Sequence, residues 1–175
     1  AEALEGDELA RQVATLPVRR GGLGLRSAQR TAPAAYWASW IDALPVLSAK
    51  DPTLTARILE QLALGATATC LQELSAARAV LEEEGCQRIP SWLDAASGAR
   101  APQPQLDDEA DSGEWRRGWQ FHASSAREAS FSERVVVPAS CRSRRALLRS
   151  QSGVAAGRWL SALPTNPCTI LRPLR

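Results

Sequence analysis

The stretch LPVRRGGLGLRSAQRTAPAAYWASWIDALPVL, residues 16–47, decides the fold that we predict for this chain. Its first half is a basic turn with glycine at positions 21, 22 and 24, and glycine reaches positive φ without a steric penalty. Its second half predicts a helix whose apolar face carries Tyr36, Trp37 and Trp40. Large aromatic side chains bury much apolar surface, so we expect the rest of the chain to pack on this helix.

Two prolines are expected to bound the aromatic helix. Pro33 fits its first turn, where a backbone without an N–H group loses no hydrogen bond. Pro45 is expected to end the helix, because proline in a helix interior removes a hydrogen bond and clashes with the preceding turn.

Two more helices are predicted next, over residues 52–64 and about 68–84. Asp51 can cap the first of these at its N-terminus, and Gly65 can stop it. The second helix ends in Glu82, Glu83 and Glu84, although anions at a helix C-terminus oppose the macrodipole. Either a cation lies beside these carboxylates or the last turn frays.

Further along, the composition predicts a division of the chain. Residues 97–111 are rich in proline, small residues and acids, and they predict an exposed linker between a helical bundle at 1–96 and a smaller basic helical unit at 112–175. Within the basic unit, Ser112 can cap a helix, and Val135–Val137 predict one short extended segment. Ser140 can cap a second helix, CRSRRALLRSQ, with Leu147 and Leu148 turned inward. The predicted fold class is all-α.

Charge is distributed unevenly along the chain. Residues 1–114 carry 10 Lys and Arg against 17 Asp and Glu, whereas residues 115–175 carry 11 Arg against 2 Glu. A concentration of arginine in the second part indicates a nucleic-acid contact, or an attraction between the two halves of the chain. The residues chosen as nucleic-acid contacts are Arg142, Arg144, Arg145, Arg149, Arg116, Arg117, Arg19 and Arg20.

The sequence offers no recognisable catalytic or metal-binding motif. The glycine run lacks the Lys-Ser/Thr of a phosphate-binding loop, and His122 is the only histidine. Four cysteines, Cys70, Cys86, Cys141 and Cys168, lie too far apart in sequence for closely spaced zinc ligands. We therefore expect no enzyme activity, no cofactor, no metal and no membrane insertion, and free thiols in a reducing intracellular compartment, nuclear or cytoplasmic.

The organising stretch resembles a segment just beyond the polymerase core in reverse transcriptases of non-LTR, LINE-type retrotransposons. The resemblance consists of Pro17, the run Gly21-Gly22-Leu23-Gly24-Leu25, and a helix with Ala34 followed by the Trp37–Trp40 segment. A second stretch, RALLRSQSGVAAGRWLSALPTNP at residues 145–167, is similar to the C-terminal region of the same group. The resemblance implies a thumb or connector region that grips template RNA or target DNA.

The resemblance also implies what this chain lacks. The aromatic-Ala-Asp-Asp signature of the family's polymerase does not occur, so no catalytic residue is carried over. The chain begins with Ala and contains no Met, so we expect a fragment whose partner is an upstream polymerase core of a parent RNA-directed DNA polymerase. Two alternatives remain open, a helical protein–protein interaction module and a decayed copy without a selected function. No oligomeric state is predicted.

Overall fold

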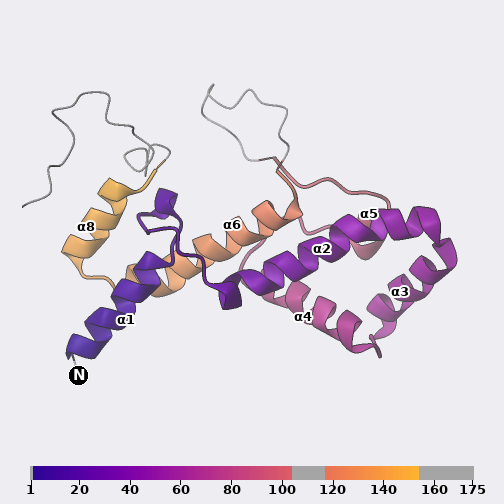
Figure 1. The fold of residues 1–175 in the computed structure, drawn as a ribbon, viewed down its shortest axis with the longest axis horizontal. Coiled ribbons are helices and arrows are strands. Elements are labelled where there is room, and N and C mark those ends of the chain that lie inside the picture. Colours follow the sequence, from indigo (N-terminus) through magenta and orange to yellow (C-terminus); the bar gives the residue numbers. More distant parts are fainter. Residues whose placement is uncertain (1, 104–116, 154–175) are drawn as a thin grey trace, which may run out of the picture. The chain divides into compact units, whose positions relative to one another are not determined.

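The computed structural model describes residues 2–103 and 117–153, and these residues form helices joined by turns and loops (Figure 1). No strand occurs in this described part of the chain, so the predicted all-α fold class is confirmed. The helices are α1 (Glu2–Ala14), the 3-10 turn η1 (Val18–Arg20), α2 (Ala28–Lys50), α3 (Pro52–Leu64), α4 (Thr69–Glu83), α5 (Trp92–Ala96), α6 (Trp119–Phe131), the π-helical turn η2 (Ser132–Val136), α7 (Val137–Ala139) and α8 (Arg142–Gln151).

The chain divides into two compact units, and the division differs from the one that the sequence suggested. Unit 1 combines residues 1–25 with residues 135–175, and unit 2 comprises residues 26–134. The sequence placed α6 with the basic C-terminal helix, but α6 belongs to unit 2 because its apolar side chains pack on α2. The predicted linker lies outside the described residues from position 104 onward, as do Ser112 and everything after Gly153.

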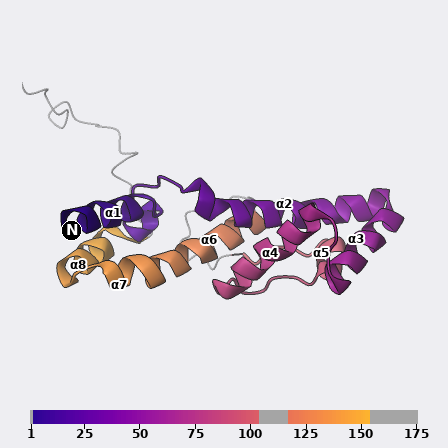
Figure 2. The same cartoon turned by 90° about the horizontal axis from the view of Figure 1, so that it is seen from below.

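Helix α2 is the centre of unit 2, where it contacts α3, α4, α5 and α6 (Figures 1 and 2). Its inward face buries Trp37, Ile41 and Leu44 almost completely. The ring of Trp37 meets the ring of Trp119 from α6 edge to face, with centroids 5.6 Å apart and an interplanar angle of 86°. This edge-to-face geometry is favourable for two aromatic quadrupoles. It stabilises the packing of α2 against α6, the two α-helices of unit 2 that lie farthest apart in sequence.

The prediction that two prolines bound α2 is wrong, because both lie inside the helix. Helix α2 begins at Ala28, five positions before Pro33, since the Ser27 side chain caps it by accepting a hydrogen bond from the Arg30 amide. At the other end α2 continues past Pro45 to Lys50. An interior proline costs about 3 kcal/mol, and packing of the last α2 turns against α3 and α5 offsets that loss.

Local signals around α3 and α4 are confirmed. Asp51 caps α3 by accepting a hydrogen bond from the Leu54 amide at 2.9 Å, and Gly65 follows its last residue with φ of 116°. Helix α4 ends at Glu83, and Gly85 then adopts φ of 77°. Helix α3 therefore begins and ends where its cap and glycine predict, and α4 ends close to the glycine that follows it.

The expected extended segment at Val135–Val137 is also wrong, because these residues are helical. The backbone of α6 passes through η2 into α7, with Val136 at φ −74° and ψ −45°. Valine favours strands only weakly, and burial decides its conformation here, since Val136 is 0% exposed. The Ser140 hydroxyl donates to the Val136 carbonyl at 2.6 Å, so Ser140 ends α7 instead of capping the basic helix.

Candidate nucleic-acid interface

The basic helix α8 presents its arginines on different faces. Arg142, Arg145 and Arg149 recur at i, i+3 and i+7, which places them on one side of a helix over about 10 Å of its length. All three are exposed, whereas Arg144 is half-buried. We call Arg142, Arg145 and Arg149 the arginine stripe. Helical periodicity alone separates this stripe from Arg144, although the four arginines were predicted from sequence as one set of contacts.

The apolar side chains of α8 do not both turn inward as predicted. Leu148 is half-buried and lies against the glycine turn, while Leu147 is 53% exposed. Adjacent residues on a helix point about 100° apart, so a short helix with one contact surface can bury only one of the pair. The N-cap residue is Cys141, which precedes the first helical arginine.

The glycine turn brings Arg19 and Arg20 next to α8 within unit 1, because η1 contacts α8. Gly21 adopts φ of 81°, and a Cβ atom there would lie 2.8 Å from the carbonyl oxygen of Leu148. A Cβ atom on Gly22 would overlap the backbone of Leu16. A hydrogen bond of 2.8 Å from the Gly153 amide to the Arg19 carbonyl connects η1 to the residues that follow α8. Only glycine permits the turn to lie this close to the backbones of Leu148 and Leu16.

Positive charge in unit 1 is concentrated in the glycine turn and around α8, whereas the acids of the unit, Glu2, Glu5, Asp7 and Glu8, lie on α1. Residues 17–25 and 135–153 contain six arginines and no aspartate or glutamate. Among the described residues, no side chain of the four α8 arginines forms an ion pair with a carboxylate or a side-chain hydrogen bond. Arg20 is half-buried, and its Nε atom is buried without a hydrogen-bond partner in this part of the chain.

Of the two remaining candidate contacts, the structure describes only Arg117. Arg117 belongs to unit 2, where its guanidinium lies 4.4 Å from the centroid of the Phe121 ring, and Arg116 lies outside the described residues. The structure thus brings together six of the eight arginines chosen from the sequence: Arg19, Arg20, Arg142, Arg144, Arg145 and Arg149.

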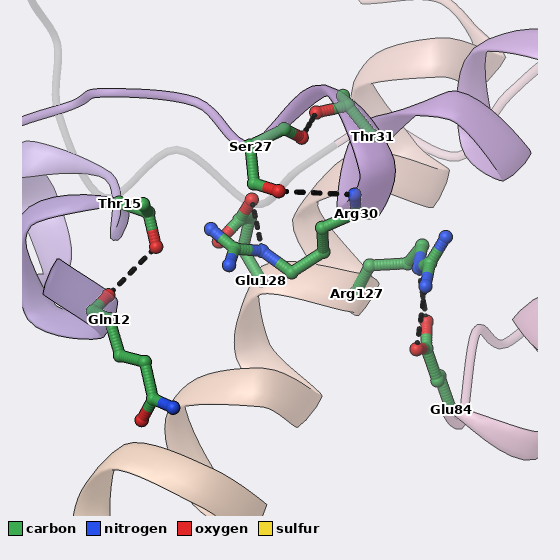
Figure 3. Close-up of polar contacts among 8 residues, drawn as sticks. All are labelled: Gln12, Thr15, Ser27, Arg30, Thr31, Glu84, Arg127 and Glu128. Carbon is green, nitrogen blue, oxygen red and sulfur yellow. Dashed lines mark hydrogen bonds and ion pairs between the residues drawn. The ribbon is translucent and has the colours of Figure 1, made fainter. Parts of the chain in front are cut away.

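Several arginines of unit 2 are held by acids inside the helical bundle. Arg30 of α2 pairs with Glu128 of α6 at 3.0 Å, and the two side chains are only 12% and 9% exposed (Figure 3). Arg127 pairs with Glu84, just beyond α4, at 2.5 Å (Figure 3). Leaving one member of such a pair buried alone costs about 3–5 kcal/mol, so these arginines act in packing.

These contacts also explain how the structure accommodates three glutamates at the C-terminus of α4. Besides the Arg127–Glu84 pair, Arg134 donates a hydrogen bond of 3.0 Å to the carbonyl of Glu83. Cations therefore lie beside the C-terminus of α4, as one of the two sequence-based alternatives required.

The described residues provide few groups for chemistry. Across residues 2–103 and 117–153, no three His, Cys, Asp or Glu side chains gather in a way that could hold a metal ion. Burial and the nearby Glu84 carboxylate raise the pKa of the Cys86 thiol to about 11. Hydrogen bonds from the Arg144 amide and from Ser143 lower the pKa of the exposed Cys141 thiol. The Nε2 atom of His122 lies 2.7 Å from the Gln87 carbonyl oxygen, so this ring nitrogen forms a hydrogen bond within the fold.

Comparison with known proteins adds no assignment. Searches against protein-family models, curated proteins and solved structures found no match to this chain. Among the described helices, none combines the length and the apolar content that crossing a lipid bilayer requires.

Replacing Gly21 by alanine should loosen α8, because the new Cβ adds a clash with Leu148 to the strain of a positive φ. Gly85 is a matched control, since its φ of 77° is similar and a Cβ there meets nothing within 4 Å. We expect about 2 kcal/mol or more of local destabilisation for Gly21→Ala, measured as faster amide hydrogen exchange in α8. Gly85→Ala should leave α8 exchange unchanged. Equal exchange of α8 in both variants would contradict the packing role of Gly21.

Proposed function

We propose that this chain is the non-catalytic C-terminal portion of a retroelement reverse-transcriptase-like protein, and that unit 1 contacts the backbone of RNA or DNA. The observation that carries the proposal is the arginine stripe on α8, beside Arg19 and Arg20 and without any acid in the same segments. The upstream polymerase core of the parent protein supplies the chemistry, in an intracellular compartment, nuclear or cytoplasmic.

The chemistry of arginine supports this assignment. A guanidinium presents a planar fork of donors that matches phosphate oxygens, and it stays charged at any physiological pH. Arg30 and Arg127 already use this fork on carboxylates, but the stripe arginines have no such partner among the described residues. Phosphate contacts position a protein without reading sequence, so we expect binding with little sequence preference.

A second candidate is a surface that binds an acidic protein. In unit 1, Leu23, Leu25 and Leu147 are 65%, 60% and 53% exposed, and apolar side chains among arginines are typical of protein interfaces. Because nucleic-acid binding depends strongly on counterion release, its salt dependence distinguishes the two candidates.

The test measures the affinity of the full chain for a structured RNA and for a DNA duplex across a salt series. The variant changes Arg142, Arg145 and Arg149 to Gln. Each lost phosphate contact on duplex DNA should lower the slope of log K against log salt by about 0.9, or roughly 2.7 for three contacts. We therefore expect a clearly shallower slope and weaker binding for the variant.

A charge-matched control changes Arg26, Lys50 and Arg57 of unit 2 to Gln, since all three side chains are exposed. It alters net charge by the same amount and should keep a slope close to that of the original chain. Absence of binding at low salt, or the same slope for both variants, would overturn the backbone contact. Tight binding of an acidic peptide in that case would favour the protein interface.

The parentage has a separate test in the genomic reading frame upstream of Ala1. An in-frame polymerase core with paired aspartates after an aromatic residue and alanine is the expected result. A start codon close to Ala1, with no such core, would contradict the retroelement origin and leave the interaction module as the better account.

A further inference from the structure

A solvent-open cavity lies in unit 2, between the two loops that flank the short helix α5. It is shallow and open to solvent, with a volume of about 430 Å³. Arg88 and Pro90 line it from the loop before α5, and Ala99 and Arg100 line it from the loop after α5. Trp119, at the first position of α6, forms part of the wall.

Polar side chains that line this cavity already form hydrogen bonds within the protein, apart from the guanidiniums of Arg88 and Arg100. The Asp94 carboxylate accepts a 2.6 Å hydrogen bond from the Ser91 hydroxyl in the N-terminal cap of α5. The indole N–H of Trp119 donates to the Ala99 carbonyl at 3.0 Å. Within the described part of the chain, the Arg88 and Arg100 side chains are exposed and form neither an ion pair nor a hydrogen bond.

Arg88 is held in an unusual backbone conformation. Its φ is 59°, and it is the one non-glycine residue with positive φ among those that the structure describes. L-residues with long side chains seldom adopt this conformation, and such strain is concentrated at ligand clamps. Next to Arg88, the Gln87 carbonyl is fixed by His122, and Pro90 is buried, so both sides of the strained residue are anchored.

We propose that this cavity binds a terminal phosphate monoester between Arg88 and Arg100. Two guanidiniums leave the cavity with a net positive charge despite the Asp94 carboxylate in its lining. A monoester phosphate carries about −1.5 to −2 charges at pH 7 and is therefore attracted more strongly than an internal phosphodiester, which carries only one. Two sources share this chemistry, a free nucleoside 5′-monophosphate and the phosphorylated 5′ end of a nucleic acid. The apolar wall of Pro90, Ala99 and Trp119 lies beside the rest of such a ligand.

This site is separate from the proposed backbone contact, because its residues all belong to unit 2 and none lies on α8. Loss of nucleic-acid binding in the stripe variant would leave it intact. Conversely, its failure would not affect the salt dependence attributed to unit 1.

Calorimetric titration uses the full-length stripe variant, with Arg142, Arg145 and Arg149 changed to Gln, so that backbone binding by unit 1 does not mask the site. The three probes are AMP, a short 5′-phosphorylated oligonucleotide, and the same oligonucleotide with a 5′-hydroxyl. We expect AMP or the phosphorylated end to bind, and the 5′-hydroxyl probe to bind at least about tenfold more weakly. Arg88→Gln and Arg100→Gln should each weaken the phosphate-dependent binding about tenfold, and Arg57→Gln should not. Binding of AMP points to a free nucleotide, and binding of the phosphorylated end alone points to nucleic acid.

The variant Arg88→Gly separates ligand binding from folding. Glycine accepts positive φ without strain, so this variant should melt at a higher temperature and still lose phosphate-dependent binding. Equal affinity for the phosphorylated and 5′-hydroxyl probes, or undiminished binding in the Arg88 and Arg100 variants, would overturn the site. So would a failure of AMP and of the phosphorylated end to bind at all.

Discussion

Burial of one face of α2 is the constraint on which unit 2 depends. Four helices meet this face, and Trp37 at its centre is 0% exposed. Removing a side chain of that size from water contributes roughly 4–6 kcal/mol, and the edge-to-face contact with Trp119 adds to it. The same packing explains why α2 tolerates Pro45 in its interior and why α6, more than sixty residues later in the chain, belongs with α2.

The arginines divide according to whether a carboxylate lies within reach. Arg30 and Arg127 connect α6 to α2 and to the end of α4, and burial makes these pairs depend on both partners. In unit 1 the same residue type lies next to serine, leucine and glycine, with no acid in residues 135–153. The same side chain is thus a packing element at Arg30 and Arg127 and an exposed cation at Arg142, Arg145 and Arg149.

What could be predicted from the sequence was mainly local. Asp51, Gly65 and Gly85 act within a few residues of themselves, so caps and stops gave the bounds of α3 and α4 closely. The acidic end of α4 indicated either a nearby cation or a frayed last turn, and no local rule could name Arg127, which lies 43 residues away. Val135–Val137 and the two prolines of α2 were misjudged because tertiary packing outweighed propensity there. The arginine set was chosen from charge alone, and the sequence could not show that Gly21 lies against Leu148 and so brings Arg19 and Arg20 beside α8.

The most direct measurement of the central claim follows the Nε–Hε signals of the arginine side chains by NMR while a DNA duplex is added to the full chain at low salt. The account predicts that signals of Arg142, Arg145 and Arg149 shift together, while those of Arg30 and Arg127 stay in place. Movement of Arg30 and Arg127, with an unchanged arginine stripe, would contradict the division of arginines between packing and phosphate contact.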